Sequence, residues 1–306
     1  MPVAPRYHPA RRRFIAAAAG VSLGLLPGCA HTLTAAELPH RRAQARPLAP
    51  RGLALVLGSG GPRGFAHIGA LQALAQLNIA PDLIVGSSVG AMLGALAAAG
   101  RSAAQIEQLA LGLTVWDLLD FTPGGLLHGS LYTGRSVGAL ASRDTQIRTL
   151  EALPLPFAAA ATQLPERVGV AFDAGDLGLA LQASCAIVGT APPVRIGTQL
   201  YCDGDLAAPL PAQLARSLGA QRVIALDVSA WDRDTPDWVR SSRPDWVADA
   251  QRRDVLVAAE RPAIDLLLRL HLPYIAGFSE GYRRRAIALG REQTLAQADA
   301  LRRLAA

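Results

Sequence analysis

An apolar run that ends in a glycine-bracketed serine constrains this chain more than any other feature. Residues 83–96 read Leu-Ile-Val, then Gly-Ser-Ser-Val-Gly, then a run of small helix-forming residues. This order predicts a strand, a sharp turn and a helix. Gly86 and Gly90 lack the side chains that would block so tight a bend, so Ser88 would stand at its apex with its hydroxyl turned out of the sheet. A tight turn without any chemistry is the alternative interpretation.

Apolar strands and helices alternate from residue 53 to residue 227. We expect strands at 53–57, 83–85, 157–162, 167–172, 199–202 and 222–227, and helices at 65–77, 91–96, 102–113, 177–184 and 211–218. Strands that read as continuous apolar runs are typical of a sheet covered on both faces. The predicted fold class is therefore α/β, with three α/β/α layers around a mostly parallel central sheet.

Two further segments carry weaker patterns. The glycine-punctuated stretch 114–135 predicts a long loop or lid. After residue 228 three tryptophans stand among Asp, Arg and Pro without a clear period, and we expect a late strand at 254–257 with helices starting at Ala263 and Gly281.

The first 51 residues predict a targeting signal and a tether that do not belong to the folded domain. Residues 1–28 hold an arginine cluster, a short apolar stretch and Leu-Pro-Gly, which is the order of a secretory signal peptide. The apolar stretch is shorter than the roughly 20 residues that span a bilayer. Cys29 resembles the lipidated cysteine of a bacterial lipoprotein, although Pro27 departs from that pattern, and residues 29–51 would form the lipidated end and a tether.

This interpretation predicts export to the bacterial periplasm and a lipid anchor. By analogy with other lipoproteins, Ala30 after the cysteine favours the outer membrane. The arginine cluster resembles a twin-arginine signal, and the Sec route is also open. A basic leader on a cytoplasmic protein is the alternative.

Charge argues against a nucleic-acid partner. The 30 basic residues are all arginine and give a net charge of +6, but residues 1–28 carry four of them and no acid, so 26 basic against 24 acidic residues leave +2. No basic footprint remains for nucleic acid. Two cysteines also remain, Cys185 and Cys202, and their apolar surroundings predict buried thiols, although an exported protein could join them.

A glycine-rich loop lies directly after the first predicted strand. Residues 58–64 read Gly-Ser-Gly-Gly-Pro-Arg-Gly and open a helix. Consecutive glycines allow backbone N–H groups to face a developing negative charge, and a helix N-terminus adds partial positive charge. A nucleotide loop is the competing interpretation, but a P-loop needs lysine, and Arg63 stands where a dinucleotide fingerprint needs glycine. We therefore expect no nucleotide partner.

The histidines do not complete a Ser-His-Asp triad in an obvious way. They stand at positions 8, 31, 40, 67, 128 and 271. Such a triad places its histidine in a loop late in the chain, whereas the sequence around His271 predicts a helix. Each histidine also has a plain structural interpretation, so the residues alone leave the proton acceptor open.

Three ordered motifs resemble the patatin-like phospholipases, in particular their bacterial branch. They are the glycine loop with the start of its helix, the serine turn, and Leu-Tyr-Cys-Asp-Gly, at 58–69, 86–90 and 200–204. Further agreement at 157–162, 183–187 and 208–211 extends the resemblance over roughly 52–228. It implies a catalytic domain at 52–228, with 229–306 as a C-terminal extension packed on the same domain.

The resemblance also implies a Ser–Asp dyad that needs no histidine, in a serine acyl-ester hydrolase. Carried over, Ser88 is the nucleophile and Asp203 the proton acceptor, followed by Gly204 and Asp205 of the Asp-Gly motif. The loop residues implied in the oxyanion hole are Gly60, Gly61, Arg63 and Gly64. Phospholipid or lysophospholipid is the implied substrate, met at a membrane, with Leu126, Leu127 and Leu131 as an apolar rim. No metal or cofactor is implied.

Some positions depart from the family pattern. Ser59 and Pro62 alter the glycine loop, Val188 and Ala191 alter the segment before the last motif, and Asp205 replaces a small residue. Asp205 would compete for the role of base or repel anionic head groups. A lipid-binding or scaffolding protein on the same fold is therefore one alternative. A conventional Ser-His-Asp esterase using His128 or His271 is another.

Overall fold

The computed structural model describes residues 52–114, 117 and 134–306, and all structural statements below concern these residues. The predicted signal peptide, Cys29 and the tether lie outside them, as do most of the expected 114–135 loop and His128. Among the described helices, none is long and apolar enough to cross a membrane.

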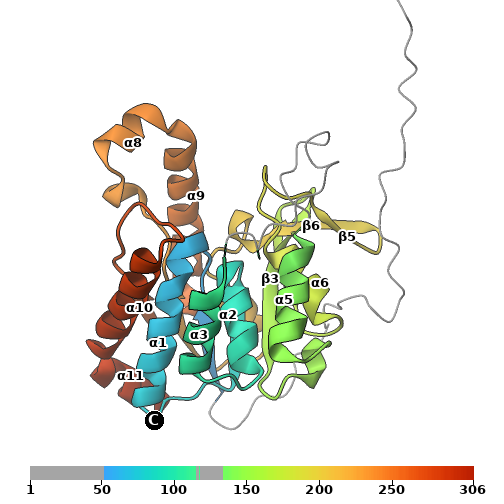
Figure 1. Cartoon of the computed structure of the whole chain (residues 1–306), viewed down its shortest axis with the longest axis vertical. Coiled ribbons are helices and arrows are strands. Elements are labelled where there is room, and N and C mark those ends of the chain that lie inside the picture. The colour runs from blue at the N-terminus through green and yellow to red at the C-terminus, as the bar shows by residue number, and fades with distance from the viewer. Residues whose placement is uncertain (1–51, 115–116, 118–133) are drawn as a thin grey trace, which may run out of the picture. The chain divides into compact units, whose positions relative to one another are not determined.

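One sheet forms the centre of the described chain (Figure 1). Its strands are β1 (Leu53–Leu57), β2 (Leu83–Ser87), β3 (Phe157–Leu164), β4 (Val168–Phe172), β5 (Val194–Ile196), β6 (Gln199–Asp203), β7 (Arg222–Asp227) and β8 (Leu266–Arg269). They pair in the order β5-β6-β3-β2-β1-β7-β8, and β4 also pairs with β3. The pairs β3–β2, β2–β1, β1–β7 and β7–β8 are parallel, whereas β4, β5 and β6 pair antiparallel.

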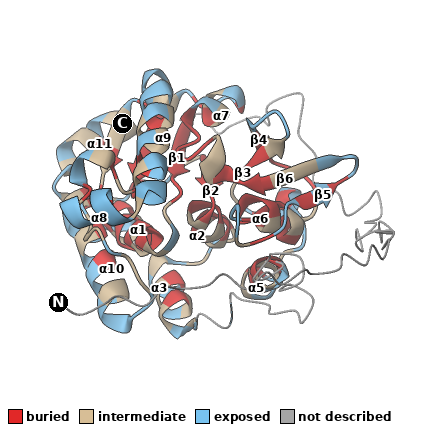
Figure 2. Cartoon of the chain, turned by 90° about the horizontal axis from the view of Figure 1, so that it is seen from above, coloured by how far each residue is buried: buried red, intermediate tan, exposed pale blue. Residues whose placement is uncertain are grey.

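Helices cover both faces of this sheet. They are α1 (Phe65–Gln76), α2 (Val89–Ala98), α3 (Ala103–Gly112), α5 (Arg135–Thr145), α6 (Leu177–Ser184), α7 (Ala212–Ser217), α8 (Asp237–Ser242), α9 (Pro244–Glu260), α10 (Glu280–Leu295) and α11 (Ala298–Ala305). Along β1, Leu53, Leu55 and Leu57 join a core with α1, α2 and α6, whereas Ala54 and Val56 join a second core with α7 and α9. Figure 2 shows the buried strands between helices whose outer faces are exposed. The predicted α/β/α fold with a mostly parallel sheet is confirmed.

The pairing around β3 brings two strand ends together. Residues 159–160 of β3 pair with both β2 and β4, and residues 161–163 pair with both β4 and β6. Because a strand has two edges and β4 occupies one of them throughout, β2 and β6 must share the other. Ser87 pairs with Ala160 and Asp203 pairs with Ala161, so the last residues of β2 and β6 lie next to each other along this edge.

The segment after residue 228 adds to the same sheet and to one of its helical layers. β8 pairs parallel with β7 and extends the sheet by one strand. Helix α10 crosses α1 closely at glycines on both helices: a Cβ at Gly69 would lie 1.9 Å from the Ile287 carbonyl oxygen, and one at Gly290 would lie 2.1 Å from the Ala66 carbonyl oxygen.

Two expectations for this segment were wrong. Residues 254–257 are not a strand but part of α9, in which Ala250 and Val257 are buried at helical spacing and Val255 is exposed. The helix expected from Ala263 is instead a 3₁₀ turn followed by β8. The leucines of β8 form a strand because they pair with the edge of β7. Helix α5 and the short strand β5 were not predicted.

Replacement of Gly290 tests the close crossing of α1 and α10. Alanine at 290 would force the two backbones apart, and we expect Gly290→Ala to lower the free energy of unfolding by about 2–3 kcal/mol. Gly281 lies on the same helix with open space around it, so Gly281→Ala should be neutral or stabilising by up to about 1 kcal/mol. Urea denaturation measures both, and equal effects of the two variants would contradict the crossing.

Candidate active site

Ser88 occupies a strained turn between β2 and α2. Its backbone angles, φ 54° and ψ −122°, fall in a region that residues with side chains rarely adopt. The flanking glycines are required by close contacts: a Cβ at Gly86 would lie 2.4 Å from the Gly90 carbonyl oxygen, and one at Gly90 would lie 2.2 Å from the Leu57 carbonyl oxygen. The turn predicted at residues 86–90 is present in this form.

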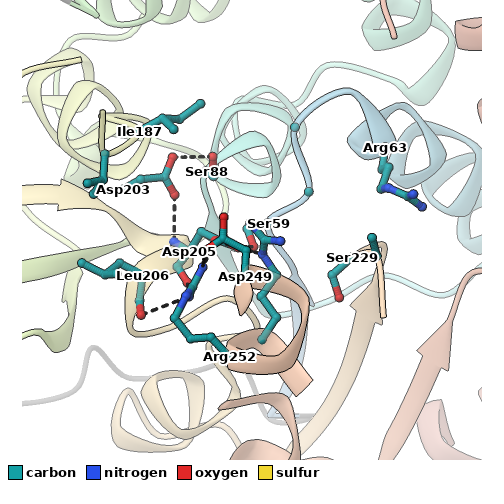
Figure 3. Close-up of a pocket in the computed structure, with 15 residues that line it drawn as sticks. Ser59, Arg63, Ser88, Ile187, Asp203, Asp205, Leu206, Ser229, Asp249 and Arg252 are labelled. Carbon is teal, nitrogen blue, oxygen red and sulfur yellow. Dashed lines mark hydrogen bonds and ion pairs between the residues drawn. The ribbon is translucent and has the colours of Figure 1, made fainter. Parts of the chain in front are cut away.

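The hydroxyl of Ser88 donates a hydrogen bond to Asp203. Its Oγ lies 2.7 Å from Asp203 Oδ2, and both side chains are buried. Figure 3 shows the two side chains pointing toward each other across the ends of β2 and β6. The backbone N–H of Ser88 donates to Ser184 Oγ at 3.0 Å, and Ser184 in turn donates to the Ala160 carbonyl at 2.6 Å. Ser184 therefore fixes the turn from α6, a role that its place in the sequence did not reveal.

Asp203 is held on several sides and is unusually basic. Its other carboxylate oxygen accepts the backbone N–H of Asp205 at 2.8 Å, and its carbonyl accepts the Thr162 hydroxyl at 2.8 Å. Burial, and next the negative charge of Asp205, raise the pKa of Asp203 to about 7, against the hydrogen bonds from Asp205 and Ser88 and the charge of Arg253. A carboxylate with this pKa can accept a proton near neutral pH.

Gly204 allows the two strand ends to approach. A Cβ at this position would lie 2.4 Å from Ser87 Oγ and 2.6 Å from the Ala160 carbonyl oxygen. The glycine of the Asp-Gly motif is therefore needed because β6 ends against β2.

The glycine loop leaves two backbone amides without an acceptor in the described part of the chain. The N–H groups of Gly60 and Gly61 donate to no described residue, whereas Ser59 N–H donates to the Pro209 carbonyl and Arg63 N–H to the Gly60 carbonyl. Gly64 instead supplies space, since a Cβ there would lie 2.3 Å from Val89 Cγ2. Of the four loop residues singled out in the sequence, Gly60 and Gly61 thus offer the open donors.

Two side chains hold this loop in place. His67 Nε2 lies 2.8 Å from the Gly58 carbonyl oxygen, and burial lowers the pKa of His67 to about 4, so the ring is neutral and donates this bond. The Arg63 guanidinium donates to the Tyr274 carbonyl and lies over the Tyr274 ring. In Figure 3 Arg63 lies apart from Ser88 and Asp203. His67 thus supports the loop from α1, and Arg63 ties the loop itself to the segment around Tyr274.

The Asp205 carboxylate is held by three side chains. Its carboxylate accepts hydrogen bonds from Ser59, from Arg252 Nη2 at 2.6 Å and from Arg253 Nε at 2.7 and 2.9 Å. Although burial opposes ionisation, the charge of Arg253 and the hydrogen bonds from Arg253 and Ser59, together with the charge of Arg252, lower the pKa of Asp205 to about 2. The arginines come from α9, which the sequence did not connect with the site.

These groups surround a cavity of about 430 Å³ (Figure 3). Ser88 and Asp203 line it together with the glycine loop, apolar residues and the charged cluster of Asp205 and α9. Ile187 and Val188 bring an apolar surface to its rim, and both are exposed. The cavity therefore offers both an apolar and a charged wall beside the serine.

The described histidines and cysteines do not line this cavity, although the Cys185 thiol lies close to Ser88 and Asp203. None of the described residues that line the cavity is a histidine; His271 lines a neighbouring cavity and packs edge-on against Trp231, with ring centroids 5.1 Å apart. The sequence placed His271 in a helix, and this was wrong: His271 lies in the segment between β8 and α10. Cys185 and Cys202 are free buried thiols, in agreement with the sequence.

A family model described as patatin-like phospholipase matches residues 55–216. The chain belongs to the patatin-like phospholipase family. It is 37% identical over 197 residues to patatin-like phospholipase domain-containing protein 7 of Mus musculus, covering 61% of this chain and 14% of the mouse protein. It is 36% identical over 179 residues to an uncharacterized NTE family protein of Mycobacterium bovis, covering 58% of this chain and 49% of that protein. The chain thus spans half or less of these relatives.

A solved structure supports the fold. VipD from Legionella pneumophila superimposes with a TM-score of 0.50 at 17% identity, over 83% of this chain and 68% of VipD. At this identity the likeness concerns the patatin-like fold alone. Helix α9 and strand β8 lie beyond the residues that match the family model.

The raised pKa of Asp203 predicts a pH-dependent stability. The folded chain binds this proton more tightly than the unfolded chain, so the carboxyl contributes stability at low pH that is lost as the pH rises through 7. The free energy of unfolding of the wild type, minus that of Asp203→Asn, should fall by about 3 kcal/mol between pH 5 and pH 9.

Urea denaturation across this pH range measures the difference. Asp299→Asn is the control, because Asp299 is exposed on α11 and its carboxylate is solvated in the folded and unfolded chain. A difference between wild type and Asp203→Asn that stays constant with pH would contradict the raised pKa.

Proposed function

We propose that this protein is a serine acyl-ester hydrolase acting on lipids, with Ser88 as nucleophile and Asp203 as proton acceptor. The observation that carries the proposal is the 2.7 Å hydrogen bond from Ser88 Oγ to a buried carboxylate, at the floor of a cavity that the glycine loop also lines. A serine hydroxyl becomes an effective nucleophile when an adjacent base accepts its proton.

In the first half of the reaction, Ser88 Oγ attacks the ester carbonyl carbon while its proton passes to Asp203 Oδ2. The carbonyl oxygen becomes negative, and the open N–H groups of Gly60 and Gly61 stabilise it. When the tetrahedral intermediate collapses, the bond to the leaving alcohol breaks and the alcohol takes the proton from Asp203. An acyl group then remains on Ser88.

In the second half, a water molecule gives a proton to Asp203 and attacks the acyl carbon. The bond to Ser88 Oγ breaks, Ser88 regains its proton from Asp203, and the fatty acid leaves. Asp203 can serve both halves because its pKa of about 7 permits proton binding and release at neutral pH. No histidine is needed in this scheme.

We propose phospholipid or lysophospholipid as the substrate class. The family to which the chain belongs supports this choice, and so does a cavity with an apolar wall for an acyl chain and charged residues for a polar head. Residues 52–228 would form the catalytic domain, with 229–306 as an extension of the same domain.

Hydrolysis of a defined phospholipid mixture in vesicles, followed by mass spectrometry of the products, tests the proposal. The wild type should release free fatty acid with a rate that rises with pH around 7, because Asp203 accepts a proton only when ionised. Ser88→Ala and Asp203→Asn should both reduce the rate to the uncatalysed background. Ser241→Ala, on exposed α8, is the control and should keep the wild-type rate.

Two outcomes would contradict the proposal. Fatty acid release that persists in Ser88→Ala would exclude the serine. Binding of the wild type to the vesicles without any release would favour a lipid-binding protein on the same fold.

We also propose export and lipid anchoring through Cys29, with the membrane bringing enzyme and substrate together. The support lies in the sequence of residues 1–29 alone. Incorporation of a labelled fatty acid into the protein in bacterial cells, and its loss in Cys29→Ser, is the expected result. Equal labelling of both would contradict the anchor.

A further inference from the structure

One carboxylate links three segments that lie far apart in the sequence. Ser59 belongs to the glycine loop after β1, Asp205 follows β6, and Arg252 and Arg253 belong to α9. The Asp205 carboxylate accepts a hydrogen bond from each of the three side chains. Arg252 Nη1 also donates to the backbone carbonyls of Asp205 and Leu206. All four side chains line the cavity that contains Ser88.

This cluster adjoins both halves of the proposed catalytic machinery. Ser59 immediately precedes Gly60, whose N–H group has no acceptor among the described residues and is the proposed oxyanion donor. The backbone N–H of Asp205 donates to Asp203 Oδ1 at 2.8 Å, on the oxygen that Ser88 does not use. A displacement of Asp205 would therefore change the position of the glycine loop and of the base together.

The glycine loop needs such an anchor. Gly61 has a φ of 54° and open space around it, so little packing holds this point of the loop. Charge-assisted hydrogen bonds are about twice as strong as neutral ones, and a carboxylate paired with two guanidinium groups is fixed in direction. Oxyanion donors are effective when they are held in place before the reaction begins.

We propose that Asp205, held by Arg252 and Arg253, is a positioning residue that fixes the glycine loop against Asp203. Helix α9 then contributes to the active site through these two arginines. This inference rests on the proposed acyl hydrolysis and deepens it. Helix α9 lies outside residues 55–216, which match the family model.

The cluster also sets the charge around Asp203. The groups that face the Asp203 carboxyl are Ser88, the thiols of Cys185 and Cys202, the Asp205 carboxylate and the Arg253 guanidinium. Burial raises the pKa of both thiols, so they are neutral near pH 7. The negative charge of Asp205 raises the pKa of Asp203, and the positive charge of Arg253 lowers it. Removal of each charge should therefore shift the activity in opposite directions along the pH scale.

The test is the pH dependence of kcat and kcat/KM for a soluble short-chain ester, measured on the full chain. Asp205→Asn should move the acidic limb to lower pH, and Arg253→Gln should move it to higher pH, each by about half a unit to one unit. Both should lower kcat by about 10- to 100-fold, with a smaller change in KM, because the reacting groups are displaced.

Two further variants separate charge from geometry. Arg253→Lys keeps the positive charge but loses the Nε–H group that contacts both carboxylate oxygens, so it should leave the pH profile near that of the wild type and still lower kcat. Arg243→Gln removes a half-buried arginine at the N-cap of α9, which pairs with Asp245 and lies over the Trp246 ring, and should change neither quantity. Thermal denaturation of each variant checks that the fold is retained.

The outcomes distinguish this inference from the proposed function. If the wild type hydrolyses the ester through Ser88 but Asp205→Asn and Arg253→Lys keep the wild-type kcat, the positioning role is wrong and the hydrolase stands. If the acidic limbs of Asp205→Asn and Arg253→Gln stay in place or move together, the charge coupling to Asp203 is wrong. If hydrolysis does not depend on Ser88, both fall.

Discussion

The site depends on two strands that end against each other along one edge of β3. β2 pairs with the first half of that edge and β6 with the second, so Ser87 and Asp203 occupy adjacent rungs, opposite Ala160 and Ala161. The next residue after β2 is Ser88, and its hydroxyl reaches the Asp203 carboxylate directly. Gly86, Gly90 and Gly204 are required because backbones approach too closely there for any side chain. Sheet register therefore places the serine and the acid in contact, although 115 residues separate them in the sequence.

Two carboxylates two residues apart have opposite environments. Asp203 is buried and has no cation in direct contact among the described residues, and its pKa is about 7. Asp205 holds two arginines and a serine hydroxyl, and its pKa is about 2. Such a separation supports the proposed roles, because only the weaker acid exchanges protons near neutral pH. The arginines stabilise the charge of Asp205, which favours Asp203 as the proposed base.

Local signals in the sequence were sufficient for the central fold and for the proposed nucleophile, but not for the proposed proton acceptor. The serine turn, the glycine loop and the apolar strands each follow from residues close together in the chain, and the Asp-Gly motif entered through the family resemblance. The contributions of β8 and α9 could not be foreseen, because a strand at the edge of a sheet and an arginine pair on a helix gain their meaning from distant partners. Ser184 and His67 were missed as supports for the same reason. The predicted signal peptide and Cys29 lie outside the described residues and stay predictions.

The most direct test of the central claim is the rate at which a fluorophosphonate modifies Ser88, followed by intact-protein and peptide mass spectrometry as the pH is varied. The account predicts a single adduct on Ser88, formed at a rate that rises with a midpoint near pH 7 and that collapses in Asp203→Asn. An adduct on another residue, or labelling of Ser88 that is as fast in Asp203→Asn as in the wild type, would contradict the claim that this acid activates this serine.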